Sequence, residues 1–314
     1  GSASGGFFVR QAAPASARKI LHLGRRRGVC HWRDAVGRNY DECRLCMLKD
    51  YVLTSPGSGQ TAEEFVASFW DERWRDGQSA QRRSLRKKEE YRFLRSAYPP
   101  LETAQADILD CGCGLGNWTL FFTAQGHRAI GLDLAPETVE RLRREHGDRF
   151  RLGDFRKIDC PDSSFDLVIN WGGIEHFEEG PVPAILEARR VLRPGGVFVA
   201  TTPCHNLRLV LLDTLLGRWT GPGHPFHNHR FYQYRFSRTE LEGYFRSCGL
   251  VKVRSRIING AQGVHRSLEH ELGWLGSRLP YLVRGGLMWI GGRLLRPFLG
   301  HMVICAGMKP IDGA

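Results

Sequence analysis

The sequence predicts an α/β fold: a doubly wound, mostly parallel β-sheet with helical insertions that act as lids over one edge. Two observations support this prediction. From residue 107 to residue 202, short apolar runs alternate with segments of helical periodicity, as in consecutive βαβ units. The first run opens onto closely spaced glycines, as is typical of the point where such a sheet meets a ligand. With 314 residues, 42% of them hydrophobic, the chain can bury one large core.

The individual elements follow from the same patterns. Short aliphatic runs predict five strands, at 107–111, 128–132, 149–152, 166–170 and 196–202. Apolar residues at helical spacing predict helices between them, at 117–124, 136–145 and 183–192. Pro136 suits the first turn of its helix, and Arg193-Pro194-Gly195-Gly196 predicts a tight turn before the fifth strand.

After the fifth strand we expect a helix and two more strands, at 237–248, 251–258 and 302–308. Two enlarged segments separate them and are predicted to be lid insertions. Residues 203–235 are rich in Pro, Gly, His and aromatic residues, whereas 260–300 combine basic and apolar residues. We interpret the second insertion as a substrate lid or a membrane-touching surface. Residues 63–98 have helix-like aromatic and charge spacing and are expected to cap the sheet.

The net charge of +12 comes from the two ends of the chain. Basic residues outnumber acidic ones by 19 to 11 in residues 1–100 and by 15 to 6 after residue 200, but not between them. Such flanks suit a solvated Arg-rich surface, an anionic membrane surface, nucleic acid or a phosphorylated substrate. No uncharged apolar run of about 18 residues occurs, so a membrane-spanning helix is not expected.

Nine irregularly spaced cysteines indicate reduced thiols and a cytoplasmic protein, although residues 1–33 also resemble an organellar targeting sequence.

Residues 1–60 are predicted to be a basic N-terminal arm in front of a domain at 61–314. Cys30, Cys43 and Cys46 match half of a zinc ribbon, for which His22 or His31 could supply the fourth ligand. The other half of the motif is irregular, so packing of reduced thiols is the alternative interpretation.

The stretch D-I-L-D-C-G-C-G-L-G-N-W, residues 107–118, ends a predicted strand and begins a predicted helix. Gly112, Gly114 and Gly116 would let a ligand approach the main chain near a helix N-terminus. The third glycine arrives one residue early for a dinucleotide fingerprint. Asp133 ends the next strand, where its carboxylate could bond both hydroxyls of a ribose. No other Cys or His lies near Cys111 and Cys113 in the sequence, so a ligand is expected here rather than a metal.

Together with G-L-D-L at 131–134, G-D-F at 153–155, F-D-L-V-I-N at 165–170 and R-V-L-R-P-G-G at 190–196, this stretch resembles the class I S-adenosylmethionine-dependent methyltransferases. The similarity is strong over residues 100–202, and 301–309 resembles the antiparallel last strand of that family. It implies a Rossmann-like, seven-stranded sheet and S-adenosyl-L-methionine as cofactor. The resemblance also implies the cofactor-binding residues. These are Asp110, Gly112, Gly114 and Gly116 for the methionine part, Asp133 for the ribose, Asp154 and Phe155 for the adenine, and Asn170 and Trp171 beside the sulfonium. Asn117 and Leu134 are further expected cofactor-binding residues.

The segment W-G-G-I-E-H-F, 171–177, follows the fourth strand, where the family places residues that face the acceptor. His176 could take a proton there as a general base, with a structural histidine as the alternative. Glu175 and His176 match the last two letters of E-x-x-E-H, with which ubiquinone-pathway O-methyltransferases bind a divalent metal. Gly172 replaces the first Glu of that motif.

Other chemistry-bearing residues are less decisive. The first insertion contains side chains that could bind a metal or face the acceptor: His224, His227, His229, Tyr232 and Tyr234. A polar aromatic lid without a metal is the alternative interpretation. Cys204 lacks the motifs that surround the nucleophilic cysteine of cytosine-C5 methyltransferases. The sequence N-W-G-G replaces the N-P-P-Y type of tetrad, so a nucleic-acid base is not expected as acceptor.

These observations predict a small-molecule methyltransferase that favours O-methylation of a bulky or lipid-like acceptor. Two alternatives stay open. One is a catalytically weak protein of this fold that binds RNA or an anionic membrane surface through its basic flanks. The other is a nicotinamide-dependent oxidoreductase, which the early third glycine disfavours.

Overall fold

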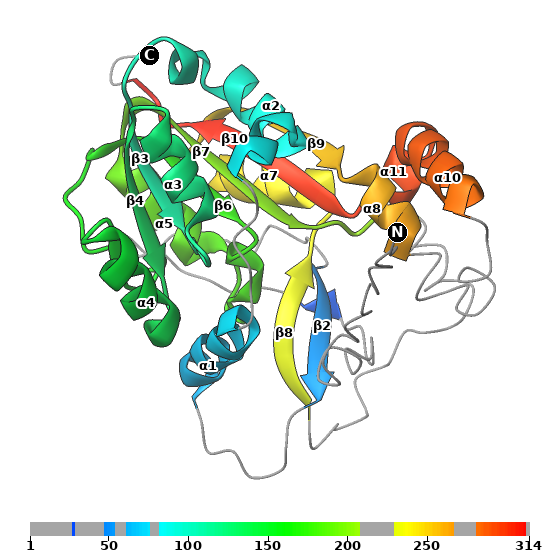
Figure 1. The fold of residues 1–314 in the computed structure, drawn as a ribbon, viewed down its shortest axis with the longest axis horizontal. Coiled ribbons are helices and arrows are strands. Elements are labelled where there is room, and N and C mark those ends of the chain that lie inside the picture. Colours follow the sequence, from blue (N-terminus) through cyan, green and yellow to red (C-terminus); the bar gives the residue numbers. More distant parts are fainter. Residues whose placement is uncertain are drawn as a thin grey trace, which may run out of the picture.

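The computed structural model describes residues 27–28, 47–53, 61–75, 82–207, 229–266 and 281–311. Its centre is a seven-stranded sheet of order β5-β4-β3-β6-β7-β10-β9 (Figure 1). The strands are β3 (Asp107–Cys111), β4 (Arg128–Asp133), β5 (Phe150–Leu152), β6 (Phe165–Trp171), β7 (Leu192–Pro203), β9 (Val251–Ile258) and β10 (Met302–Met308). Neighbouring strands from β5 to β7 are parallel, and β10 is antiparallel to both β7 and β9. The predicted doubly wound, mostly parallel sheet is confirmed.

Helices cover both faces of this sheet because side chains on both faces are apolar. In β3, Ile108 belongs to one hydrophobic cluster, and Leu109 and Cys111 belong to the other, as the alternation of a strand requires. The Ile108 face is covered by the 3₁₀ turns η2 (Arg82–Lys87) and η3 (Pro99–Glu102) and the helices α2 (Glu89–Ala97) and α3 (Asn117–Ala124). The opposite face is covered by α5 (Val182–Val191) and α7 (Arg238–Ser247). Helix α4 (Pro136–His146) packs on β5 and α3.

The predicted tight turn at 193–196 is wrong, because these residues lie inside β7. Leu192 pairs with Phe165 and Val197 pairs with Leu167, so the extra residues of β7 form a bulge between two ladder positions. Gly195, with φ at 81°, absorbs the bend. The helix predicted at 237–248 is present as α7, and Ser237 and Glu240 bond reciprocally at its start as a capping box.

The two predicted insertions differ from each other. The described end of the first one is a strand, β8 (His229–Arg235), which pairs with β2 (Met47–Leu53) in a second sheet that also contains β1 (Arg27–Gly28). The second insertion contains helices α8 (Gly260–Arg266), α10 (Tyr281–Leu294) and α11 (Arg296–Leu299). Helix α1 (Ala62–Arg75) and the β2–β8 pair lie beyond the carboxyl ends of the central strands (Figure 1).

Several predicted ligands fall outside the described residues: Cys30, Cys43, Cys46, His22, His31, His224, His227 and the side chain of His229. Within the described residues, no three His, Cys, Asp or Glu side chains gather closely enough to hold a metal ion. None of the helices described here has the length and apolar character needed to cross a bilayer.

Candidate functional site

The turn after β3 contains three glycines with left-handed backbone. The φ angles of Gly112, Gly114 and Gly116 are 69°, 51° and 69°, a region that residues with a Cβ rarely adopt. The amide of Gly112 donates to the Leu132 carbonyl at 2.7 Å, which ties the turn to the end of β4. A Cβ at Gly116 would lie 2.6 Å from the ring of Phe150. The first two glycines therefore shape the wall of the site, whereas the third is required by packing beneath it.

Two buried aspartates flank this turn. Asp110 Oδ2 accepts hydrogen bonds from the amide (3.1 Å) and the hydroxyl (2.8 Å) of Thr119. Burial raises the pKa of Asp110 to about 7 against the effect of these bonds, and the Asp133 carboxyl raises it further. Asp133 accepts from the amides of Gly114 (2.7 Å) and Ala135 (3.0 Å), and burial raises its pKa too. Both carboxyls hold the backbone and still have lone pairs for a ligand.

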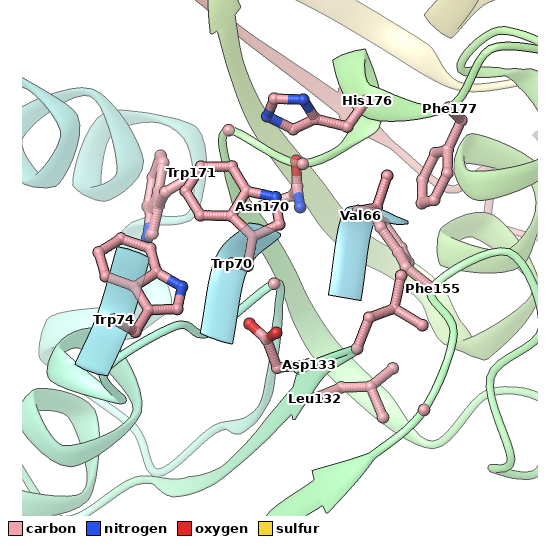
Figure 2. A pocket seen from close by; sticks show the side chains of 15 residues that line it. Val66, Trp70, Trp74, Leu132, Asp133, Phe155, Asn170, Trp171, His176 and Phe177 are labelled. Carbon is pink, nitrogen blue, oxygen red and sulfur yellow. The ribbon is translucent and has the colours of Figure 1, made fainter. Parts of the chain in front are cut away.

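Two pockets lie beyond the carboxyl ends of β3, β4 and β6, and they share Trp74, Gly112 and Trp171 in their walls. The aromatic pocket, shown in Figure 2, is also lined by Val66, Trp70, Leu132, Asp133, Leu134, Gly153, Phe155, Asn170, Gly172, Gly173, His176 and Phe177. The polar pocket is also lined by Leu85, Lys88, Glu90, Asp110, Cys113, Gly114, Leu115, Asn117, Trp118, Thr201, Asn259, Gln262, His301 and Met302. The shared walls make the two pockets adjoining parts of one site.

Three buried polar atoms in the wall of the polar pocket have no hydrogen-bond partner in the described part of the protein. They are Asp110 Oδ1, Asn117 Oδ1 and Trp171 Nε1. Unpaired buried polar atoms are costly and therefore uncommon in folded proteins. This set offers two acceptors and one donor beside the glycine turn, which matches the ammonium and carboxylate of an α-amino acid.

Helix α1 forms one wall of the aromatic pocket with Val66, Trp70 and Trp74 (Figure 2). The two indole rings stack at 5.3 Å with an interplanar angle of 19°, and Trp74 packs over Gly114. Asp71 of the same helix accepts hydrogen bonds from the amide of Thr138 at 2.9 Å, its hydroxyl at 2.8 Å, and the neighbouring amide of Glu137 at 3.2 Å. Asp71 thus caps α4 from another helix and fixes α1 over the pocket.

The loop after β6 is held by Asn170 and by close backbone packing. Asn170 Nδ2 donates to the Cys111 carbonyl at 2.7 Å, and Oδ1 accepts from the Ile174 amide at 3.1 Å. A Cβ at Gly173 would collide with the Asn170 amide, so this position needs glycine for close approach. The Glu175 carboxyl is 2% exposed and lines neither pocket, and burial raises its pKa to about 8. Glu175 is therefore a neutral acid at pH 7.

His176 reaches the wall of the aromatic pocket. Its Nδ1 lies 2.6 Å from the Tyr232 carbonyl, which can only accept, so Nδ1 carries the proton and Nε2 keeps a lone pair. The imidazole packs edge-on against Trp70 at 5.2 Å and beside Tyr232 at 5.0 Å. Burial lowers its pKa to about 4, against the effect of the Tyr232 carbonyl. His176 is neutral at pH 7, and its Nε2 lies 4.0 Å from Glu175 Oε1.

Comparison with known proteins agrees with this geometry. A family model described as a methyltransferase domain matches residues 109–200, which run from within β3, just before the glycine turn, to within β7. The chain contains a class I S-adenosylmethionine-dependent methyltransferase domain.

Three relatives illustrate the similarity of the methyltransferase domain. A probable S-adenosylmethionine-dependent methyltransferase of Mycolicibacterium smegmatis is 38% identical over 101 residues, covering 32% of this chain and 39% of that protein. Malonyl-[acyl-carrier protein] O-methyltransferase of Serratia marcescens is 33% identical over 96 residues, 30% of this chain and 37% of that protein. Ubiquinone biosynthesis O-methyltransferase of Cereibacter sphaeroides is 27% identical over 167 residues, 51% and 66% of the two chains. The chain thus spans about two fifths of the length of the first two relatives.

Among solved structures, phosphoethanolamine N-methyltransferase 2 of Haemonchus contortus in complex with S-adenosyl-L-methionine is similar in fold. Its TM-score is 0.51 at 15% sequence identity, covering 82% of this chain and 61% of that one. At this identity the similarity supports the methyltransferase fold alone.

The structure brings most of the predicted site residues of the methyltransferase domain together. The walls of the two pockets contain Asp110, Gly112, Gly114, Asn117, Asp133, Leu134, Phe155, Asn170, Trp171 and His176. Gly116, Asp154 and Glu175 are not in these walls. The Asp154 carboxylate instead binds the Arg156 guanidinium at 2.6 Å.

The sequence did not predict two groups of site residues. Trp70 and Trp74 were part of a segment expected to cap the sheet, but their positions in the pocket wall, with Trp74 over Gly114, depend on the distant Asp71 contact. The polar pocket is also lined by Asn259, between β9 and α8, and by Gln262 of α8. The side-chain amide of Asn259 donates to the Glu90 carboxylate at 3.2 Å, which links the residue before α8 to helix α2. That these residues belong to the site follows only from contacts between segments distant in the sequence.

Proposed function

We propose that the methyltransferase domain binds S-adenosyl-L-methionine across the junction of the two pockets. The amino-acid end would lie beside Asp110, Asn117 and Trp171, whose unpartnered atoms suit an ammonium and a carboxylate. Asp133 would accept from the ribose hydroxyls, and Phe155 would lie against the adenine. The unpartnered atoms beside the glycine turn are the observation that carries this proposal, because a bound amino acid would satisfy them.

The bound cofactor supplies a methyl group on a sulfonium, which is transferred by in-line displacement. The task of the protein is then to hold the acceptor at near-attack distance and to exclude water. Asn170 and Trp171 are proposed to border the sulfonium, since Asn170 fixes the loop after β6 and Trp171 lies in both pocket walls. The hydrogen bonds of Asn170 make this border rigid.

His176 is the proposed general base for an acceptor that arrives protonated. Its Nε2 lone pair can receive a proton, while the Tyr232 carbonyl holds the ring in one tautomer. With a pKa near 4 the imidazole is a weak base, so it would take the proton only as methyl transfer makes the acceptor atom acidic. Glu175 is proposed to act through this imidazole, since it lies in neither pocket wall.

The proposed acceptor is a small molecule that is bulky or lipid-like, with oxygen as the favoured methylated atom. Two of the relatives are named as O-methyltransferases, one of malonyl-[acyl-carrier protein] and one of ubiquinone biosynthesis. The reacting end would lie beside Trp171, where the two pockets meet, because His176 in the wall of the aromatic pocket has to reach it. The rest of the acceptor would extend into the polar pocket, which offers Glu90, Asn259 and Gln262 as polar contacts.

Isothermal titration calorimetry with S-adenosylhomocysteine tests donor binding. We expect the wild-type protein to bind and Asp133→Ala to bind about 10- to 100-fold more weakly, because charge-assisted hydrogen bonds contribute about 1.5–3 kcal/mol. Asp148→Ala is the control, since the side chain of Asp148 is 95% exposed. Equal affinity of Asp133→Ala and wild type would contradict the ribose contact.

The acceptor itself can be sought by native mass spectrometry of the purified protein. Once the acceptor is known, His176→Ala should lose turnover while keeping its affinity for S-adenosylhomocysteine. Full turnover of His176→Ala would remove this residue from the mechanism.

A further inference from the structure

Helix α10 carries an exposed apolar stripe on one face. Val283, Leu287, Ile290 and Leu294 follow one another at intervals of four, three and four residues, so they lie on the same side of the helix. Their exposed fractions are 46%, 44%, 51% and 74%. Trp289, beside this stripe, is 65% exposed. These five side chains are half of the large hydrophobic residues that the described surface exposes, and four of them share one face of α10.

The helix cannot bury this stripe by rolling inward, because its other face is packed through glycines. Gly292 lies directly against Gly260 of α8, and a Cβ at Gly292 would be 2.6 Å from the Ala261 nitrogen. A Cβ at Gly291 would be 3.2 Å from Val264. Such close backbone approach fixes the rotation of α10 on α8. The stripe is therefore held outward as a rigid surface.

The segment that carries the stripe has only basic charges in its sequence. Residues 272–311 contain no Asp or Glu but contain Arg278, Arg284, Arg293, Arg296 and Lys309. Arg296 pairs with Glu89 of α2 at 2.9 Å. The Arg293 guanidinium lies over the Trp289 ring at 5.1 Å from its centroid, so a cation and an amphipathic ring stand at the edge of the apolar strip. An indole ring and arginine side chains suit the boundary between acyl chains and phosphates.

We propose that the outer face of α10 docks on the surface of an anionic lipid bilayer, with the stripe among the acyl chains and Arg293 among the phosphates. A second copy of this chain fits less well, because pairing two stripes would bring like charges together. Helix α8 contributes Gln262 to the polar pocket and packs against α10 on its other side. Docking would therefore hold the polar pocket near the lipid interface.

Vesicle co-sedimentation of the full chain tests this proposal. Vesicles of phosphatidylcholine alone are compared with vesicles of phosphatidylcholine mixed with phosphatidylglycerol, for the wild type and for a Trp289→Ser/Leu294→Ser variant. Ile311→Ser is the matched control, since Ile311 is 54% exposed but lies outside α10. Because both substituted side chains of the double variant are exposed, it should fold, which circular dichroism and thermal unfolding verify. Arg293→Gln isolates the contribution of charge.

We expect the wild type and Ile311→Ser to bind the anionic vesicles, and the double variant to bind about ten-fold more weakly or worse, from loss of buried apolar area. Arg293→Gln should weaken binding several-fold, and added salt should weaken wild-type binding. Absence of wild-type binding, or equal binding of wild type and double variant, would overturn the proposal. A dimer that the double variant abolishes would instead show that a second copy covers the stripe. S-adenosylhomocysteine affinity is a separate readout, so failure of donor binding leaves this result interpretable.

Discussion

The contact between Asp71 and helix α4 allows a quantitative prediction. Asp71 is 6% exposed and accepts two amide hydrogen bonds and one hydroxyl hydrogen bond at the start of α4. The N-cap residue of α4 itself is Ala135, whose side chain cannot cap. Asp71→Ala removes all three acceptor contacts, whereas Asp71→Asn keeps the oxygen that accepts from both groups of Thr138.

The expected loss of stability follows from these contacts. Removing an N-cap oxygen costs about 1 kcal/mol, and leaving buried donors unpaired costs about 1–3 kcal/mol more. Loss of the negative charge at a helix N-terminus adds about 0.3–1 kcal/mol. We therefore expect Asp71→Ala to lower the free energy of unfolding by about 2–5 kcal/mol. Asp71→Asn should lower it by about 1 kcal/mol, because Asn caps helices about as well as Asp.

Urea unfolding followed by tryptophan fluorescence measures this free energy, and hydrogen exchange locates the change. In Asp71→Ala, the amides of Glu137 and Thr138 should lose protection together with those of α1, since one side chain joins the two helices. Affinity for S-adenosylhomocysteine should also fall, because α1 carries Trp70 and Trp74 into the pocket wall. Glu72→Ala, at the exposed neighbouring position, is the control. Unchanged protection of the α4 amides in Asp71→Ala would refute the proposed tether.

Three further substitutions have expected outcomes in unfolding experiments. The stability of Glu175→Gln relative to wild type should rise by about 1 kcal/mol per pH unit between about pH 5 and pH 8. In this range the Glu175 carboxyl of the wild type loses its proton in the unfolded state but keeps it in the folded state, so the wild type loses stability. A stability difference that does not change with pH would contradict the raised pKa. Gly116→Ala should cost about 1–3 kcal/mol more than Gly126→Ala, since both φ angles are positive but only the Cβ at residue 116 would meet a ring; equal losses would contradict this packing. Ser237→Ala should cost about 1 kcal/mol by urea unfolding, unless the capping box does not form in solution.

The central sheet could be predicted because its signals are local. The α3 limits at 117 and 124 match the predicted ones, and each predicted strand overlaps an observed strand. In a parallel sheet the ligand-facing residues follow the carboxyl ends of consecutive strands, so Asp110, Asp133 and Asn170 could be assigned to one edge from their positions alone. The turn at 193–196 was wrong because a Pro-Gly-Gly sequence suits a bulge as well as a turn, and the partner strand decides between them.

The remainder of the site could not be predicted because it depends on contacts distant in sequence. Asp71 and Thr138 are 67 residues apart, and no local pattern marks either as a partner of the other. The pairing of β8 with β2 joins residues 229–235 to residues 47–53, a segment interpreted as part of a basic arm. Asp154 was assigned to the adenine from its place in a motif, but Arg156, two residues later, occupies its carboxylate. Whether a carboxylate binds a neighbouring guanidinium or a ligand depends on side-chain geometry, which the sequence does not show.

The raised pKa of the buried Asp110 carboxyl predicts that binding of a cationic ligand depends on pH. Asp110 has a pKa of about 7 in the free protein, so part of the population is protonated at neutral pH. An ammonium placed beside Asp110 Oδ1 would favour the ionised form, and binding would then release a proton. Affinity should therefore rise as pH increases through about 7, and calorimetry in buffers of different ionisation enthalpy measures the released proton. Asp110→Asn cannot ionise and should abolish the release. If the wild type released no proton, the amino-acid end of the ligand would not lie beside Asp110.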